Sequence, residues 1–222
     1  MSPFKTAWSF SVLTTFETCP KKYYHLKVAR DAKDGDSEAA AEGKAVHDAM
    51  FKRVCKGKPL PLPMRQHEKM AARFADAKGE KHGEMKMCLN NKFEPVDWFA
   101  KDAWVRAIAD LLIINGDTAT IVDWKTGKKK IDFTQLKLSA AVLSRLMPEI
   151  NNFKLVFVWL RNSDVSFETI SKDEIKSVWM EMLPRVKEIE TAMKTTSFPA
   201  KESGLCGWCP VTQCPHWFER MN

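Results

Sequence analysis

The sequence predicts an α/β fold in which a mixed central sheet is flanked by helices. Helical periodicity dominates the first 80 residues, and β-rich runs follow in the middle of the chain. One helix interrupts these runs, and a last helix precedes a cysteine-rich segment. Strands that alternate with helices in this way are typical of a sheet covered by helices.

The N-terminal part predicts helices separated by clear breaks. Apolar residues recur at helical spacing from Phe10 to Leu26, and Pro20 disturbs the middle of this first helix. A second helix stops at Gly57, and the proline-rich stretch after it ends helices because proline lacks a backbone N–H. The predicted helices cover residues 9–27, 38–57 and 65–78.

The middle of the chain changes to a β pattern. Runs rich in β-branched and aromatic residues predict strands, and "NGD" between two of them predicts a tight hairpin. "SKDE" at residues 171–174 is a capping box that predicts the start of the last helix. The predicted strands cover residues 84–96, 104–114, 118–127, 153–161 and 165–170, and the predicted helices cover 133–146 and 171–193.

Composition limits the classes of protein that need to be considered. The chain has 222 residues, enough for one domain, and its 35 Lys and Arg against 28 Asp and Glu give a net charge of +7. This surplus fits a polyanionic partner such as nucleic acid, or ordinary solubility charge. No signal peptide or membrane-length apolar run is present, so we expect an intracellular, cytoplasmic protein without a membrane partner. In that compartment disulfides are rare, and the six cysteines indicate metal ligands or buried thiols.

The predicted hairpin carries two carboxylates and a lysine. Its loop is either residues 115–116 or residues 116–117, and in both registers Asp110, Asp123 and Lys125 project from one face of the sheet. Two carboxylates within cross-strand reach can chelate one hard cation such as Mg²⁺ or Mn²⁺. The alternative is a structural ion pair between Lys125 and one of the carboxylates.

These residues resemble the RecB-like branch of the PD-(D/E)XK nuclease superfamily. The matching motifs are "IAD", "IVDWKTG" and the "EGKAVHDAM" setting of His47. The resemblance implies a restriction-endonuclease-like fold and a nuclease site. In that site His47, Asp110, Asp123 and the Trp124 carbonyl hold Mg²⁺ or Mn²⁺, Lys125 aligns the nucleophile, and Glu84 is the acidic residue of the first strand.

Three cysteines lie close together near the end of the chain, at positions 206, 209 and 214. The fourth candidate is Cys19, which precedes a proline, as Cys209 and Cys214 do. The "SFSVLTTFETCPKKYYHLKV" segment resembles the N-terminal cysteine helix of the superfamily's iron–sulfur subgroup, which includes AddB and the CRISPR-associated RecB-like exonucleases. The resemblance implies a 4Fe–4S cluster on Cys19, Cys206, Cys209 and Cys214 that joins the N- and C-terminal segments. Four thiolates around zinc are the competing possibility.

Residues after the catalytic strand are candidates for DNA contacts. Lys128, Lys129 and Lys130 follow it directly, and such a lysine run either contacts phosphates or forms a solvated face. Gln135 matches half of the family's Gln-x-x-x-Tyr signature, but Ser139 stands where the tyrosine would be. This departure puts the DNA-orienting role of the helix in doubt.

The resemblance as a whole implies a single nuclease domain over residues 1–222. Residues 1–80 form its N-terminal helical part with Cys19 and His47, residues 81–170 its catalytic sheet core, and residues 171–222 its C-terminal helix and cluster segment. The expected activity is metal-dependent exonucleolytic hydrolysis of single-stranded DNA ends, 5′ to 3′, in a prokaryotic or phage-infected cell. A recombination or repair protein is a possible partner. Two alternatives stay open: a non-catalytic DNA-binding module held together by zinc, and a restriction-type endonuclease.

Overall fold

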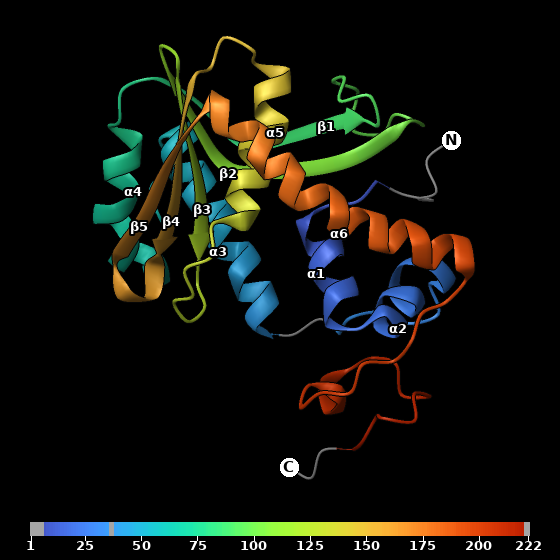
Figure 1. Ribbon diagram of the computed structural model, residues 1–222. Coiled ribbons are helices and arrows are strands. Elements are labelled where there is room, and N and C mark those ends of the chain that lie inside the picture. The colour runs from blue at the N-terminus through green and yellow to red at the C-terminus, as the bar shows by residue number, and fades with distance from the viewer. Residues whose placement is uncertain (1–6, 36–37, 220–222) are drawn as a thin grey trace.

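A five-stranded mixed sheet forms the centre of the computed structural model, which describes residues 7–35 and 38–219 (Figure 1). The strands lie in chain order, β3 pairs with β4 in parallel, and every other neighbouring pair is antiparallel. The predicted mixed sheet flanked by helices is therefore confirmed. The strands are β1 (Glu80–Asn90), β2 (Ala103–Asn115), β3 (Thr118–Lys125), β4 (Asn152–Trp159) and β5 (Asp164–Ser171).

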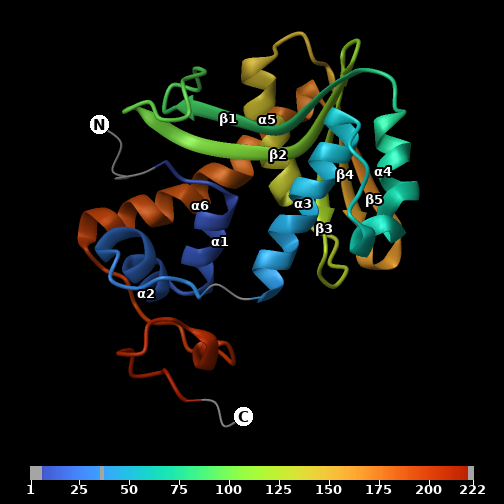
Figure 2. The same ribbon diagram turned by 180° about the vertical axis from the view of Figure 1, so that it is seen from behind.

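Helices cover both faces of the sheet. On one face α1 (Phe10–Thr18), α5 (Thr134–Leu146) and α6 (Ile175–Thr195) contribute to a large apolar core. On the other face α3 (Glu38–Lys56) and α4 (Glu68–Ala75) bury a second apolar cluster. Figure 1 looks onto the face with α5 and α6, and Figure 2 onto the face with α3 and α4.

The predicted first helix is broken at Cys19. After α1 the chain is extended at Cys19 (φ −162°, ψ 110°), and Pro20 then opens the short helix α2 (Pro20–Tyr23). A π-helical turn, Tyr24–Ala29, continues it. A single helix over residues 9–27 was wrong because a residue before proline avoids the helical region. Cys19 consequently lies at a corner between two helices instead of on a helix face.

Two further boundaries differ from the prediction. The expected helix over residues 65–78 is a 3₁₀ turn, Leu62–His67, followed by the shorter α4. The first strand lies earlier than predicted, at Glu80–Asn90. The capping box is confirmed, since Ser171 and Glu174 make both reciprocal bonds, although a 3₁₀ turn, Lys172–Glu174, precedes α6.

The hairpin between β2 and β3 has a two-residue loop, Gly116 and Asp117, because Asn115 pairs with Thr118. Gly116 has a φ of +60°, which this tight turn requires and which glycine adopts without strain. Of the two loops that the sequence allowed, the structure has the second. β3 pairs with β2 only from Leu111 to Asn115, so the N-terminal half of β2 extends beyond β3 together with β1 (Figure 1).

The first helices lie beside α6 and the segment that follows it. Arg185 of α6 forms two hydrogen bonds with the Glu17 carboxylate, at 2.6 and 2.9 Å. The Lys201 side chain donates to the Glu17 carbonyl at 3.0 Å, and the Lys21 amide donates to the Pro199 carbonyl at 3.3 Å. These contacts join the first helices to the C-terminal segment. No described helix combines the length and the apolar character that crossing a membrane would need.

Candidate functional site

Asp110 and Asp123 lie directly beyond the last paired residues of the hairpin, Leu111 and Val122. The Asp110 Oδ2 atom accepts a hydrogen bond of 2.9 Å from the Trp124 amide. Asp110 is thereby fixed beside the end of β3, next to the residue that follows Asp123. Strand pairing and this side-chain hydrogen bond together bring the two carboxylates into one neighbourhood.

His47 and Glu84 join Asp110 from two other elements. One ligand atom each of His47, Glu84 and Asp110 lies within 4.8 Å of the other two, which is close enough to hold one metal ion. His47 comes from α3, and its Nδ1 atom lies 3.3 Å from Asp110 Oδ2. Glu84 comes from β1, at the position between the pairs Gly83–Leu111 and Met85–Ala109 and therefore opposite Asp110.

Glu84 has a backbone conformation that glycine usually adopts. Its φ is +54°, in the left-handed region, where a non-glycine residue costs about 1 kcal/mol or more. Its neighbour Gly83 cannot be replaced without movement, because an added Cβ would lie 2.1 Å from the Phe51 ring. The close contact between β1 and α3 thus coincides with the strand distortion that presents Glu84 to His47 and Asp110.

Asp123 is the most buried charged group of the site. It is 7% exposed, and its Oδ1 atom accepts a hydrogen bond of 3.1 Å from the Gln135 amide. Its buried Oδ2 atom has no hydrogen-bond partner among the described residues, and its neighbour is the Lys125 Nζ atom at 2.8 Å. That lysine also lies 5.2 Å from the Phe157 ring centre. A buried carboxylate oxygen with one lysine beside it still has capacity for a cation.

The charges of the site perturb one another. Burial, and then the charge of Asp110, raise the pKa of Asp123 to about 6, against the opposing effect of Lys125. Burial and Asp110 also raise the pKa of Glu84. The hydrogen bond to Asp110 raises the pKa of His47, and the Trp124 backbone adds to this effect. These carboxylates repel one another when they are ionised together. A divalent cation bound between them and the histidine would stabilise their ionised forms.

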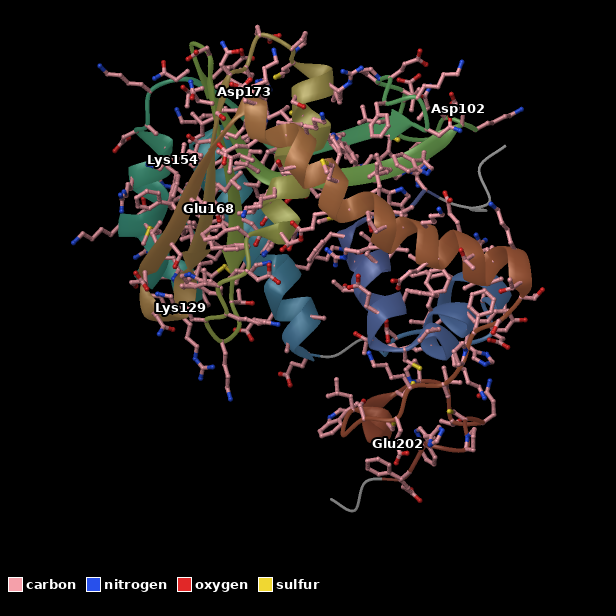
Figure 3. The ribbon with its side chains drawn as sticks, viewed as in Figure 1. Asp102, Lys129, Lys154, Glu168, Asp173 and Glu202 are labelled. Atoms are coloured by element: carbon pink, nitrogen blue, oxygen red, sulfur yellow. The ribbon has the colours of Figure 1, made fainter. Side chains whose placement is uncertain are left out.

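The predicted DNA-contact residues lie in two places. Lys128, Lys129 and Lys130 are exposed in the loop after β3, and Lys129 pairs with Asp164 at 2.6 Å. In Figure 3, Lys129 lies at the end of the sheet beside the turn between β4 and β5. Gln135 instead contacts the site itself, since it reaches both Asp123 and, at 3.4 Å, Lys125. The expected DNA-contact role of Gln135 did not include this contact, which its position in the first turn of α5 could have indicated.

The four candidate cluster cysteines line one cavity of about 250 Å³. Cys19 enters it from the corner between α1 and α2, and the other three come from the C-terminal segment. The cavity is also lined by His216 and by Trp208, which is 60% exposed. The structure therefore brings together Cys19, Cys206, Cys209 and Cys214, while Cys55 and Cys88 lie elsewhere and burial raises the pKa of both thiols.

Backbone amides point at two of the sulfurs. The Lys201 amide lies 3.4 Å from Cys19 Sγ, and the Ser203 amide lies 3.4 Å from Cys206 Sγ. Amide donors of this kind stabilise thiolates, which are the metal-binding form of cysteine.

Comparison with known proteins identifies a family. The family described as the PD-(D/E)XK nuclease superfamily matches residues 7–215. No curated protein sequence matches the chain significantly. A crystal structure from Eubacterium rectale, provisionally named an exonuclease, is 15% identical and covers 92% of this chain and 87% of its own, with a TM-score of 0.57. The crystal structure of SSO0001 is 12% identical and covers 93% of this chain and 86% of its own, with a TM-score of 0.49. At 15% identity, the similarity to the Eubacterium rectale structure shows a shared fold.

Proposed function

Because the chain belongs to the PD-(D/E)XK nuclease superfamily, we propose that it is a metal-dependent exonuclease that degrades single-stranded DNA from its ends, 5′ to 3′. The observation that carries this proposal is the convergence of His47, Glu84 and Asp110 within 4.8 Å. The provisional name of the Eubacterium rectale protein supports exonuclease over endonuclease activity. The single-strand preference and the polarity rest on the sequence resemblance.

We assign the metal site to residues from four elements. His47 of α3, Asp110 of β2 and Asp123 of β3 would hold Mg²⁺ or Mn²⁺, together with the Trp124 carbonyl, and Glu84 of β1 would complete the acidic set. The buried Asp123 Oδ2 atom has Lys125 Nζ at 2.8 Å and no other hydrogen-bond partner among the described residues, which supports this assignment. When bound, such an ion supplies Lewis-acid stabilisation of phosphate charge and lowers the pKa of a water molecule.

Lys125 and Gln135 have separate tasks in this site. The Lys125 side chain is one-third exposed, so its ammonium group can face both Asp123 and an incoming phosphate. There it would stabilise the negative charge that develops on the phosphate oxygens. The Gln135 side chain donates to Asp123 Oδ1 and so helps to fix the orientation of the carboxylate. These two side chains orient the acidic residues, and neither gains or loses a proton in doing so.

The cysteine cavity would hold a 4Fe–4S cluster as a structural element. Two observations support this proposal: four cysteines share one cavity, and backbone amides point at two of their sulfurs. The cluster would join the corner at Cys19 to the C-terminal segment and contribute folding free energy. Its removal should therefore loosen the two chain ends before it affects the sheet.

The decisive experiment compares cleavage of end-labelled linear and circular single-stranded DNA, with Mn²⁺ and with EDTA. We expect that the linear DNA is degraded in Mn²⁺ and stays intact in EDTA. The circular DNA should stay intact in both conditions. Asp110→Ala should abolish cleavage and leave DNA binding nearly intact, because it removes a carboxylate and no basic group. Asp173→Ala removes an exposed carboxylate in the 3₁₀ turn before α6 (Figure 3); it is the matched control and should cleave normally. Cleavage of circular DNA would indicate an endonuclease, and no cleavage of any DNA would refute nuclease activity.

A further inference from the structure

A groove of about 610 Å³ adjoins the candidate metal site through Gln135, which lines it and contacts Asp123. Its walls are the N-terminal half of α1, the first turns of α5 and the outer part of β2. Arg106 and Trp98 also line it. Its volume lies within the range of roughly 300–1,000 Å³ that small ligands occupy, which suits a nucleotide or two of a single strand and not a duplex.

One wall of the groove is an unpaired edge of β2. The Arg106 amide donates to the Trp8 carbonyl at 2.8 Å, and β3 pairs with β2 only from Leu111 onward. Among the described residues, the edge from 107 to 110 has no strand partner on that side. The groove is lined by the first part of this edge, Ala107 and Ile108, and by Gln135, which contacts the candidate ligand Asp123.

Arg106 and Lys27 are the cationic residues that line the groove, and Arg106 is the one held against an aromatic ring. Its guanidinium carbon lies 5.0 Å from the Trp98 ring centre, and Lys86 Nζ lies 5.7 Å from the same ring. The Arg106 Nε atom is buried and has no hydrogen-bond partner in the described structure. The nearby Cys88 thiol is only a weak acceptor. A positioned guanidinium with an unused donor matches the geometry and charge of a phosphate group.

The opposite wall is rich in hydroxyl groups. Ser9, Ser11 and Thr14 of the first turns of α1 line the groove. Ser9 caps α1 by accepting from the Val12 amide, and its hydroxyl lies 3.0 Å from that of Ser11. The described first turn of α1 contains no acidic residue, so nothing on this wall repels an anion.

We propose that this groove, the Arg106 groove, holds the segment of single-stranded DNA that adjoins the scissile phosphate. Arg106 binds a backbone phosphate, Trp98 holds the guanidinium in place, and the hydroxyls of α1 face the opposite side of the strand. The inference rests on the proposed nuclease function, because it takes the substrate class from that function. It adds the path of the strand and a specific phosphate-binding residue.

Binding in EDTA tests the groove separately from cleavage. The probe is a fluorescein-labelled oligothymidylate, and its anisotropy is measured over a range of salt concentrations. Arg106→Gln should weaken binding about tenfold and reduce the slope of log K against log salt by about 0.7, the value for one single-strand phosphate contact. Arg65→Gln, an exposed arginine before α4, is the matched control and should bind like the wild type.

A second variant avoids the half-buried arginine. Ser11→Glu places a negative charge on the groove wall, where an acidic residue in the first turn favours the helix. It should weaken oligothymidylate binding at unchanged melting temperature, whereas Thr191→Glu, on the exposed face of α6, should not. If both Arg106→Gln and Ser11→Glu bind with wild-type affinity and salt slope and still cleave DNA with Mn²⁺, the proposed role of the groove is refuted. The nuclease proposal would then still stand. A wild-type protein that neither binds nor cleaves DNA would overturn the nuclease proposal itself.

Discussion

Replacing Asp123 by asparagine should stabilise the metal-free protein at neutral pH and abolish its stabilisation by divalent ions. The carboxylate is 7% exposed, and its buried Oδ2 atom has Lys125 Nζ at 2.8 Å and no other hydrogen-bond partner among the described residues. Burial, and then the Asp110 charge, raise its pKa from 3.8 to about 6. The folded protein therefore disfavours the ionised form that the unfolded chain adopts readily. Asparagine has nearly the same shape and carries no charge.

The sign and size of the effect follow from the two pKa values. Because the pKa of Asp123 is higher in the folded than in the unfolded protein, ionisation of this group lowers the free energy of unfolding as the pH rises. This penalty is absent below about pH 3.8 and complete above about pH 6. A difference of about 2 pKa units corresponds to about 3 kcal/mol at neutral pH. Between about pH 4.5 and about pH 7.5 the penalty grows by about 2 kcal/mol. The contact with Lys125 lowers the folded pKa and is therefore already included in the value of about 6, so the growth of the penalty with pH is the quantity to measure.

Urea unfolding followed by tryptophan fluorescence measures this quantity. In EDTA, the free energy of unfolding of Asp123→Asn relative to the wild type should rise by about 2 kcal/mol from about pH 4.5 to about pH 7.5. Mn²⁺ should stabilise only the wild type. Asp164→Asn is the matched control: Asp164 also pairs with a lysine, but it is exposed and Lys129 lowers its pKa, so its trend with pH has the opposite sign. A difference that stays constant with pH would refute the reasoning.

Three further predictions concern Lys125, the lysine run and the cysteines. Lys125→Ala should lose most turnover but keep Mn²⁺ binding in calorimetry, because its charge acts on the phosphate; lost metal binding would mean that its role is misassigned. Neutralising the lysines at 128–130 together should weaken DNA binding and flatten its salt dependence, and an unchanged slope would assign them to a solvated face. Protein purified without oxygen should be brown with equal iron and sulfide. Cys19→Ser should lose the colour and melt at a lower temperature, whereas Cys88→Ser should stay brown. Colourless wild-type protein that contains one zinc ion would contradict the cluster.

The hairpin illustrates how far local sequence determines a site. A tight turn at Gly116 is encoded in a few adjacent residues, and strand alternation then relates Asp123 to Lys125. Two loop registers were open, and the pairing of Asn115 with Thr118 selects one. The choice depends on how β2 and β3 pack between the helices, which no local pattern reports. The carboxylates were therefore predictable as a pair, and their relative position was not.

The broken first helix shows the opposite case, because the signal for the break, Pro20, is local. Pro20 excludes the helical conformation from Cys19, so the chain turns there and presents the sulfur at a corner. A continuous helix would have placed this cysteine on a helix face. The position of Cys19 in the cavity is thus partly a consequence of its immediate neighbour.

By itself, the sequence determined the features that depend on short-range chemistry: the mixed α/β class, the hairpin, the capping box and the order of the candidate ligands. Only the tertiary structure decided which distant side chains meet. His47, Glu84 and Asp110 lie on three elements and converge because α3 packs on β1 where Glu84 has a positive φ. The Arg106 groove exists because β3 pairs with only the C-terminal part of β2. Such arrangements arise from long-range packing, which residue periodicity and spacing do not encode.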